Sequence, residues 1–198
     1  VTFGDGPLLI LAGAGSGKTK VLTARIAYLV IKKGVAPESI LAVTFTNKAA
    51  GEMRRRLFFL IGDRAQRLWL GTFHSIGVKL LRREARAAGI GHDLTIYDDA
   101  DQLSLIKQVM GDLSINEKTF SPKAILSRIN QAKNENIGAS EFAKDAHDFL
   151  SERVAKVYSL YQKKLREYGA MDFGDLICEP VTMLRQNPNI LKRYQDLF

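Results

Sequence analysis

The chain has 198 residues, of which 46% are hydrophobic and 25% charged, an ordinary composition for one or two globular domains. No apolar run approaches the roughly 18 residues of a membrane span, and no basic segment with an apolar core opens the chain, so we expect no membrane segment and no secretory signal. The net charge of +8 favours a polyanionic partner, most simply a nucleic acid. Cys178 is the only cysteine, which excludes an internal disulfide and a cysteine-based zinc site and predicts a cytoplasmic location.

The first part of the chain is predicted to alternate between strands and helices. Continuous apolar runs predict buried parallel strands, and a period near 3.6 residues predicts helices. In chain order these are strand 8–12, helix 19–33, strand 40–45, helix 47–61, strand 68–72 and helix 74–88. The alternation indicates an α/β fold with a mostly parallel sheet.

After Gly89 the pattern changes to helices with hardly a strand among them. The predicted helices are 99–110, 122–134, 140–168 and 173–185. Ser121 and Pro122 mark a helix start, because serine suits the N-cap and proline the first helical position. Pro180 is expected to kink or interrupt the last of these helices. An α/β portion is therefore followed by an all-helical portion.

Residues 12–19, Ala-Gly-Ala-Gly-Ser-Gly-Lys-Thr, lie between the first predicted strand and the first predicted helix. This context predicts a P-loop, whose backbone N–H groups surround the phosphates of a nucleoside triphosphate. Lys18, the catalytic candidate, would reach the β- and γ-phosphates, and the Thr19 hydroxyl would bind Mg²⁺. A glycine-rich hairpin with a chance lysine is the alternative. The candidate nucleotide-binding residues are Ala12, Gly13, Ala14, Gly15, Ser16, Gly17, Lys18 and Thr19.

Two similar segments follow the second and third predicted strands. These are Thr44-Phe45-Thr46-Asn47-Lys48 and Gly71-Thr72-Phe73-His74. Open α/β sheets bind their ligands at the carboxyl ends of the strands. Phe45 could stack on a base of any sequence, which contributes about 1–3 kcal/mol, and Thr46 and Asn47 could hold backbone phosphates. A core phenylalanine followed by an ordinary N-cap is the alternative.

His74 suggests a metal ligand, but the chain has only 3 histidines and no cysteine or acidic pair close to this one. A polar contact to nucleic acid, or a capping role, is the better interpretation. In a P-loop enzyme an acidic residue that follows an apolar strand holds the metal, and residues 94–99 imitate this pattern. Asp98 or Asp99, however, suits the N-cap of the next predicted helix. Asp172 and Asp175 follow no predicted strand. A P-loop without a convincing acidic residue to hold the catalytic metal predicts that the sequence is incomplete.

Taken together, residues 12–19, residues 43–50 (Val-Thr-Phe-Thr-Asn-Lys-Ala-Ala) and residues 71–74 (Gly-Thr-Phe-His) resemble the first motifs of the UvrD/Rep/PcrA family of superfamily 1 DNA helicases. Residues 171–176, Met-Asp-Phe-Gly-Asp-Leu, are similar to the family's Leu-Asp-Phe-Asp-Asp-Leu stretch, with Gly174 at its variable position. The resemblance implies that residues 1–76 form the first part of a RecA-like ATP-binding domain and residues 77–198 a helical insertion. The Walker B strand is then expected after Phe198.

The resemblance also implies an ATP-driven motor of two RecA-like domains that moves 3′ to 5′ on DNA. ATP and Mg²⁺ are the implied cofactors, and single-stranded DNA and junctions of single- and double-stranded DNA are the implied partners. Lys20 stands where the family usually has an arginine that stacks on adenine, and an ammonium lacks that planar face. The residues implied to face single-stranded DNA are Phe45, Thr46, Asn47, Lys48, Thr72, Phe73 and His74.

The arginines that stabilise the transition state lie in the family's second RecA-like domain, and such groups contribute about 10³–10⁵ in rate. We therefore expect negligible ATPase and no unwinding from this chain alone. The helical insertion is expected to contact duplex DNA through some of Lys123, Arg128, Lys133, Lys163, Lys164 and Arg166. Three alternatives remain: a helicase subunit of a helicase–nuclease, a nucleotide-gated DNA-binding module without a motor, and a small-molecule kinase, which leaves both Thr-Phe segments unexplained.

Overall fold

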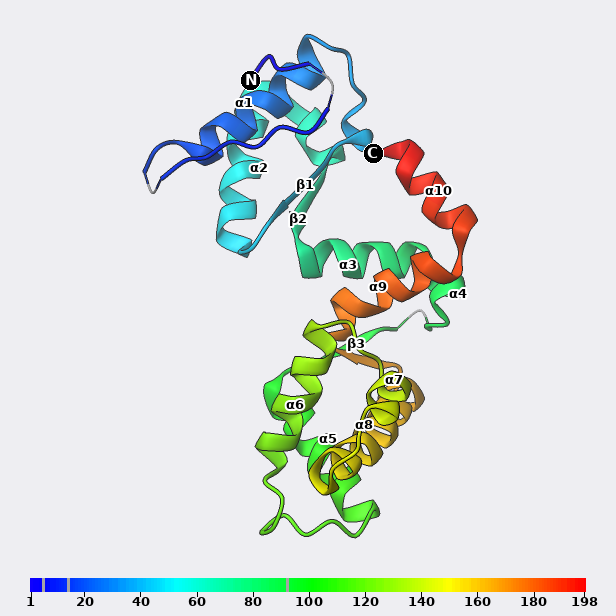
Figure 1. Cartoon of the computed structure of the whole chain (residues 1–198). Helices are drawn as coiled ribbons and strands as arrows, with labels where there is room; N and C mark the ends of the chain where they lie inside the picture. Colours follow the sequence, from blue (N-terminus) through cyan, green and yellow to red (C-terminus); the bar gives the residue numbers. More distant parts are fainter. Residues whose placement is uncertain (5, 14, 92) are drawn as a thin grey trace. The chain divides into compact units, whose positions relative to one another are not determined.

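The computed structural model of the chain describes residues 1–4, 6–13, 15–91 and 93–198. Its contacts divide the chain into two compact units (Figure 1). The first unit contains Val1–Ile76 and Pro188–Phe198, and the second contains Gly77–Asn187. Helices and two small parallel sheets make up the described part, which confirms the mixed α/β class. No described helix is long and apolar enough to cross a membrane.

The first unit is built around two parallel strands. Its elements are α1 (Lys18–Ile31), η1 (Pro37–Ser39), β1 (Leu41–Thr44), α2 (Asn47–Ile61), η2 (Gly62–Arg67), β2 (Trp69–Thr72), the start of α3 (Phe73–Arg83) and α10 (Pro188–Leu197). β1 pairs with β2 in parallel, and Thr44 lies opposite Thr72. The strands and helices predicted between residues 19 and 72 are thus confirmed, with ends that differ by one or two residues.

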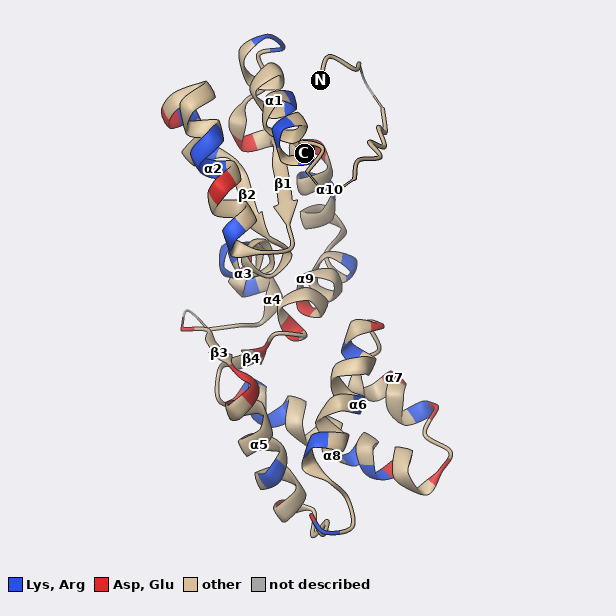
Figure 2. Cartoon of the chain, turned by 90° about the vertical axis from the view of Figure 1, so that its left-hand side faces the viewer, with Lys and Arg blue, Asp and Glu red and all other residues tan. Residues whose placement is uncertain are grey.

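α1 and α2 pack against the strands of the first unit (Figure 1). The buried side of α2 is a stripe at the spacing expected for one helix face: Ala50, Met53, Leu57 and Ile61. Ile26 and Val30 of α1 and Leu70 of β2 join the same core. The other sides of α2 carry several Lys and Arg residues (Figure 2).

The C-terminal helix belongs to the first unit. The ring of Trp69, on β2, lies 5.9 Å from that of Tyr194 and 5.4 Å from that of Phe198, both edge to face. The resemblance implies that residues 77–198 form one helical insertion, whereas the contacts group Pro188–Phe198 with Val1–Ile76. This aromatic contact joins residues far apart in the chain, so no local pattern could reveal it.

The predicted strand at residues 8–12 is wrong. These residues have no regular secondary structure, and Leu9 and Leu11 are 82% and 87% exposed. A continuous apolar run becomes a parallel strand only where neighbouring strands share its hydrogen bonds and both faces are covered. None of the described strands pairs with this run.

The second unit holds a short sheet besides its helices, so the prediction of an all-helical portion is wrong. Its elements after α3 are α4 (Ala85–Ala88), β3 (Thr95–Tyr97), α5 (Asp99–Asp112), α6 (Pro122–Asn134), α7 (Ala139–Lys144), α8 (Phe149–Glu167), β4 (Ala170–Asp172) and α9 (Asp175–Gln186). β3 and β4 pair in parallel, with Ile96 opposite Met171. Strands of three residues are too short to show a period of two.

Two predicted helices of the second unit are each divided in the structure. Helix 74–88 becomes α3 and α4, which are separated at Glu84, and helix 140–168 becomes α7 and α8. The side chain of Asp148 caps α8 by accepting from the N–H groups of Leu150 and Ser151, each at 3.0 Å. Helix 122–134 is confirmed.

Asp98 is an N-cap, as the sequence suggested. Its side chain accepts hydrogen bonds from the N–H groups of Ala100 (2.8 Å) and Asp101 (2.9 Å), and its own N–H donates to the Asp101 carboxylate. These reciprocal bonds satisfy N–H groups at the start of α5. No group of three or more His, Cys, Asp or Glu residues in the described ranges could hold a metal ion.

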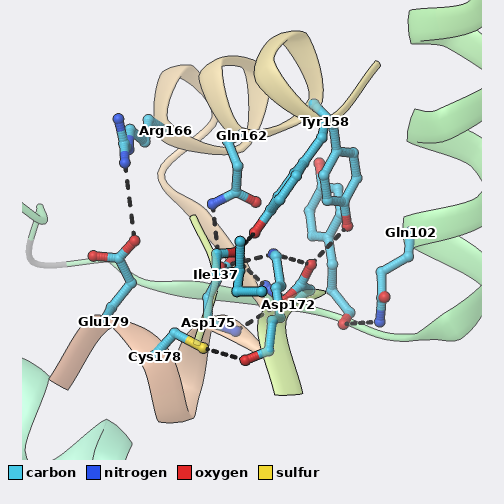
Figure 3. A network of polar contacts seen from close by, with 12 residues as sticks. Gln102, Ile137, Tyr158, Gln162, Arg166, Asp172, Asp175, Cys178 and Glu179 are labelled. Carbon is cyan, nitrogen blue, oxygen red and sulfur yellow. Dashed lines mark hydrogen bonds and ion pairs between the residues drawn. The ribbon is translucent and has the colours of Figure 1, made fainter. Parts of the chain in front are cut away.

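A buried polar network joins four elements of the second unit (Figure 3). The Lys133 Nζ, on α6, donates to Asp172 Oδ2 (2.6 Å) and Asp175 Oδ1 (2.7 Å). The Tyr161 hydroxyl, on α8, donates to Asp172 (3.0 Å), and Gln162 Nε2 donates to Asp175 (3.1 Å). Both aspartates and Lys133 are at most 4% exposed in their side chains.

The network and β4 correct the expectations for Lys133 and Asp172. Lys133 cannot be a surface phosphate contact, because its ammonium is buried between two carboxylates. Asp172 is the last residue of β4, so this acidic residue does stand at the end of a strand. Its carboxylate, however, binds the ammonium of Lys133. Burial, opposed by the charge of Lys133, raises the pKa of Asp175 to about 6. Gly174 leaves room for the lysine stem, because a Cβ there would lie 2.7 Å from Lys133 Cδ.

Pro180 lies inside α9 without interrupting it. Proline has no N–H, so it gives no helical hydrogen bond to the carbonyl of Leu176 one turn earlier. That carbonyl faces Gly77 of α3, where a Cβ would lie only 2.0 Å from its oxygen. The pair Gly77 and Pro180 thus sets how closely α3 and α9 approach.

We predict that Gly77→Ala destabilises the chain by about 1–3 kcal/mol, because the new methyl group meets the backbone of Leu176 rather than a side chain that can move. Gly111→Ala is the matched control, since a Cβ on this residue of α5 meets nothing within 4 Å. We expect that variant to be neutral or stabilised. Urea unfolding followed by circular dichroism measures both, and equal stabilities would contradict the close approach.

We predict that Lys133→Met destabilises the chain by about 3–5 kcal/mol, because it leaves two buried carboxylates without a cation. Lys163→Met is the control: this lysine is on the same unit, 71% exposed in its side chain, and pairs with Glu167 only at 3.8 Å. Its removal should change the free energy of unfolding by less than about 0.5 kcal/mol. Similar losses in the two variants would contradict the role given to Lys133.

Candidate functional site

The predicted P-loop is a glycine turn that opens α1. Gly15 and Gly17 have φ of 75° and 88°, in the left-handed region that glycine adopts without strain. The Ser16 hydroxyl donates to the Gly13 carbonyl at 2.7 Å and closes the turn. α1 then begins at Lys18. Ala14 was also predicted to bind nucleotide, but it lies outside the described residues.

The start of α1 offers donors for an anion. The first N–H groups of a helix have no partners within it, and the helix dipole favours negative charge there. Lys18 and Lys20 are exposed at this end, Thr19 is half-buried, and no acidic residue lies in the first turn. Ala12 is half-buried, and Gly13 and Ser16 are exposed. Backbone N–H groups, an ammonium and a hydroxyl form the donor set that suits a phosphate chain with a bound Mg²⁺.

The two Thr-Phe segments meet at one edge of the β1–β2 sheet. Because Thr44 lies opposite Thr72 in a parallel pair, Phe45 and Phe73 leave the sheet side by side. Their ring centroids are 5.6 Å apart, with a 50° angle between the planes. Phe45 is 90% exposed and Phe73 is 46% exposed, so neither belongs to the core. The alternative of a core phenylalanine is thereby excluded for Phe45.

Two helices begin at this same edge. Thr46 caps α2, its hydroxyl accepting from the Ala49 N–H at 3.1 Å, while the Thr44 hydroxyl donates to the Thr46 carbonyl. At the second segment, the Ser75 N–H donates to the Thr72 hydroxyl at 3.2 Å, and the Ser75 hydroxyl donates to the Thr72 carbonyl at 2.9 Å. Phe45 therefore lies just before α2, and Phe73 is the first residue of α3. The N-termini of both helices face this edge.

The polar candidates at this edge differ in how accessible they are. Asn47, Lys48 and His74 are exposed, whereas Thr72 is only 7% exposed and holds the start of α3. Thr72 therefore positions Phe73 instead of offering a surface of its own. The cluster combines two aromatic faces, one ammonium and two helix N-termini, which suits a strand of nucleotides with stacked bases and backbone phosphates.

Sequence reasoning missed two residues that shape this edge. At Gly71 a Cβ would lie 2.3 Å from Ser75 Oγ, so glycine leaves room for Ser75, which is bonded to Thr72 at the start of α3. Arg54 donates from Nη2 to the Leu70 carbonyl at 2.6 Å, which joins α2 to β2. Gly71 lies within the recognised segment but was given no role there, and Arg54 gave no signal in the sequence beyond its charge.

Comparison with known proteins agrees with these motifs. A family model described as the UvrD/REP helicase N-terminal domain matches residues 1–198. The ATP-dependent DNA helicase PcrA of Staphylococcus aureus strain MRSA252 is 47% identical over 194 residues, which cover 98% of this chain. The PcrA of Staphylococcus epidermidis is 48% identical over the same length.

The chain spans only 27% of the length of these relatives. The family model spans all the motifs that suggested the resemblance, because it covers residues 1–198. With a family model over residues 1–198 and relatives near half identity, the chain belongs to the UvrD/REP helicase N-terminal domain family.

Proposed function

We propose that this chain is the part of an ATP-dependent DNA helicase or translocase that binds ATP and single-stranded DNA. The observation that carries the proposal is the pair of exposed rings, Phe45 and Phe73, at the edge where α2 and α3 begin. Solvent-exposed aromatic residues beside helix N-termini have no role in the core of the first unit. They do suit stacking on bases without a preference for sequence.

In the proposed nucleotide site, the backbone from Gly13 to Gly17 and the first turn of α1 hold the phosphates. Lys18 balances the charge of the β- and γ-phosphates, and Thr19 directs its hydroxyl to Mg²⁺. Lys20 lies beside the base, without the stacking face of an arginine. The metal, when bound, would neutralise charge on the terminal phosphates.

In the proposed DNA site, Phe45 and Phe73 contact bases. Asn47, Lys48, His74 and the N-termini of α2 and α3 contact the backbone on either side. Affinity should fall with rising salt, because Lys48 and the helix dipoles attract phosphates and displace their counterions.

The motor activity that we propose follows the relatives, whose names describe ATP-dependent DNA helicases. Closure of two RecA-like domains on ATP would move single-stranded DNA, 3′ to 5′, in cytoplasmic DNA repair or replication. The second unit would contact duplex DNA at a junction. Lys123, Arg128, Lys163 and Arg166 are exposed candidates, whereas Lys164 is held by Asp112 at 2.7 Å.

We predict that Phe45→Ala combined with Phe73→Ala weakens binding of a fluorescent oligo(dT) by roughly tenfold or more, since each stacked base contributes about 1–3 kcal/mol. The control is Phe59→Ala, an 82% exposed phenylalanine at the other end of α2. Fluorescence anisotropy at two salt concentrations measures both variants. Unchanged affinity in the double variant would contradict the proposed DNA site.

We predict that Lys18→Ala weakens binding of a fluorescent ATP analogue with Mg²⁺ by at least about tenfold, while Lys33→Ala, beyond the other end of α1, has no effect. The chain by itself should hydrolyse ATP negligibly, with or without DNA. Turnover that Lys18→Ala abolishes would contradict the expected inactivity, and equal binding by wild type and Lys18→Ala would contradict the P-loop.

A further inference from the structure

Three consecutive large apolar residues lie exposed at the C-terminal end of α2. Phe58 is 48% exposed, Phe59 is 82% exposed and Leu60 is 50% exposed. We call these three residues the Phe58–Leu60 patch. The core side of the helix is already occupied by its buried stripe, which ends with Leu57 and Ile61. The patch therefore adds little to the folding of the first unit.

Such a run is unusual on the surface of a helix. Single exposed apolar residues are common on protein surfaces. An exposed run of three exposes apolar surface to water at a cost, which is expected only where the residues bind a partner. The rings of Phe58 and Phe59 are 6.5 Å apart and nearly perpendicular, at 73°, so the patch presents two aromatic groups already in contact. Exposed aromatic side chains that contact each other in this way mark interaction sites.

Basic residues border the patch on the side toward the start of α2. Arg55 lies one helical turn before Phe59, and Arg56 one turn before Leu60. Arg55 is exposed and forms no ion pair within the described part of the chain, while Arg56 pairs with Glu52. Arg54 donates to the Leu70 carbonyl of β2 and takes no part in this rim. Charge complementarity thus calls for an acidic partner.

A nucleic acid is a poorer match than a protein. Binding of single strands uses flat ring faces beside a continuous line of cations. Here the two rings meet edge to face, Leu60 offers no stacking face, and the carboxylate of Glu52 interrupts the basic residues. The patch also lies roughly 20 Å along the helix axis from Thr46, at the opposite end of α2 from the candidate DNA site.

We propose that the Phe58–Leu60 patch, with Arg55 and Arg56 at its rim, is a docking surface for an acidic amphipathic segment of another protein. Apolar side chains of that segment cover the two rings and Leu60, and its carboxylates pair with Arg55. The apolar centre supplies most of the affinity, and the charged rim speeds association and selects the partner. This inference does not depend on the proposed function, because DNA and the partner would occupy opposite ends of α2.

The experiment is a selection of random peptides displayed on phage, performed on the wild-type chain with counter-selection on Phe58→Ser/Phe59→Ser. We expect the enriched peptides to combine apolar or aromatic residues with a net negative charge. An enriched peptide, synthesised with a fluorophore, should bind the double variant at least about tenfold more weakly. It should bind Arg55→Glu more weakly at low salt, with a smaller difference at high salt.

Leu22→Ser is the matched control, because Leu22 is 48% exposed on α1 of the same unit and should leave peptide affinity unchanged. Thermal melting of all variants confirms that each is folded. Failure to enrich peptides specific for the wild type, or enrichment of basic peptides, would overturn the proposal. So would a loss of oligo(dT) affinity on Phe59→Ala, or self-association of the wild type that the double variant abolishes, since these results assign the patch to nucleic acid or to a second copy.

Discussion

Parallel pairing of β1 with β2 determines where the candidate DNA site can be. Parallel strands end at the same edge, so the register of Thr44 opposite Thr72 brings two segments 28 positions apart in the sequence numbering into contact. The helices that follow begin there as well, and the positive ends of their dipoles add to the same surface. A shift of one residue in this register would turn one phenylalanine toward the opposite face. The ring contact between Phe45 and Phe73 thus depends on backbone hydrogen bonds within the sheet.

The second unit depends on a different constraint, a cation buried between two carboxylates. Lys133 joins α6 to β4 and α9, and Tyr161 adds α8 through its hydroxyl. A buried ion pair adds little net stability, but it strongly penalises any arrangement that separates its members. The ion pair therefore determines which helices pack together, and it contributes less to the free energy of unfolding. The Asp-Phe-Gly-Asp stretch has an architectural role in this chain, since Gly174 gives the lysine stem its space.

The sequence predicted elements with strong local signals and failed where partners were distant. Helices 47–61 and 122–134 have clear caps and periodicity, and both are confirmed. Strand 8–12 has the composition of a buried strand, but composition cannot show which strands lie beside it. β3 and β4 were missed because three residues carry no usable period. For the candidate site, the Thr-Phe segments were recognised from order and chemistry, whereas the roles of Gly71 and Arg54 depend on contacts made after folding.

The two ends of α2 carry the two surfaces for which we propose different partners. Its core stripe occupies one face over its whole length, which leaves its N-terminus and the outer face of its C-terminal end free for other contacts. The N-terminus carries the positive end of the helix dipole, so it suits anions. The C-terminal end carries Phe58, Phe59 and Leu60, whose exposed side chains suit apolar contact. Because the two ends differ in chemistry and lie far apart along the helix, the candidate DNA site and the proposed docking surface can be tested by separate substitutions.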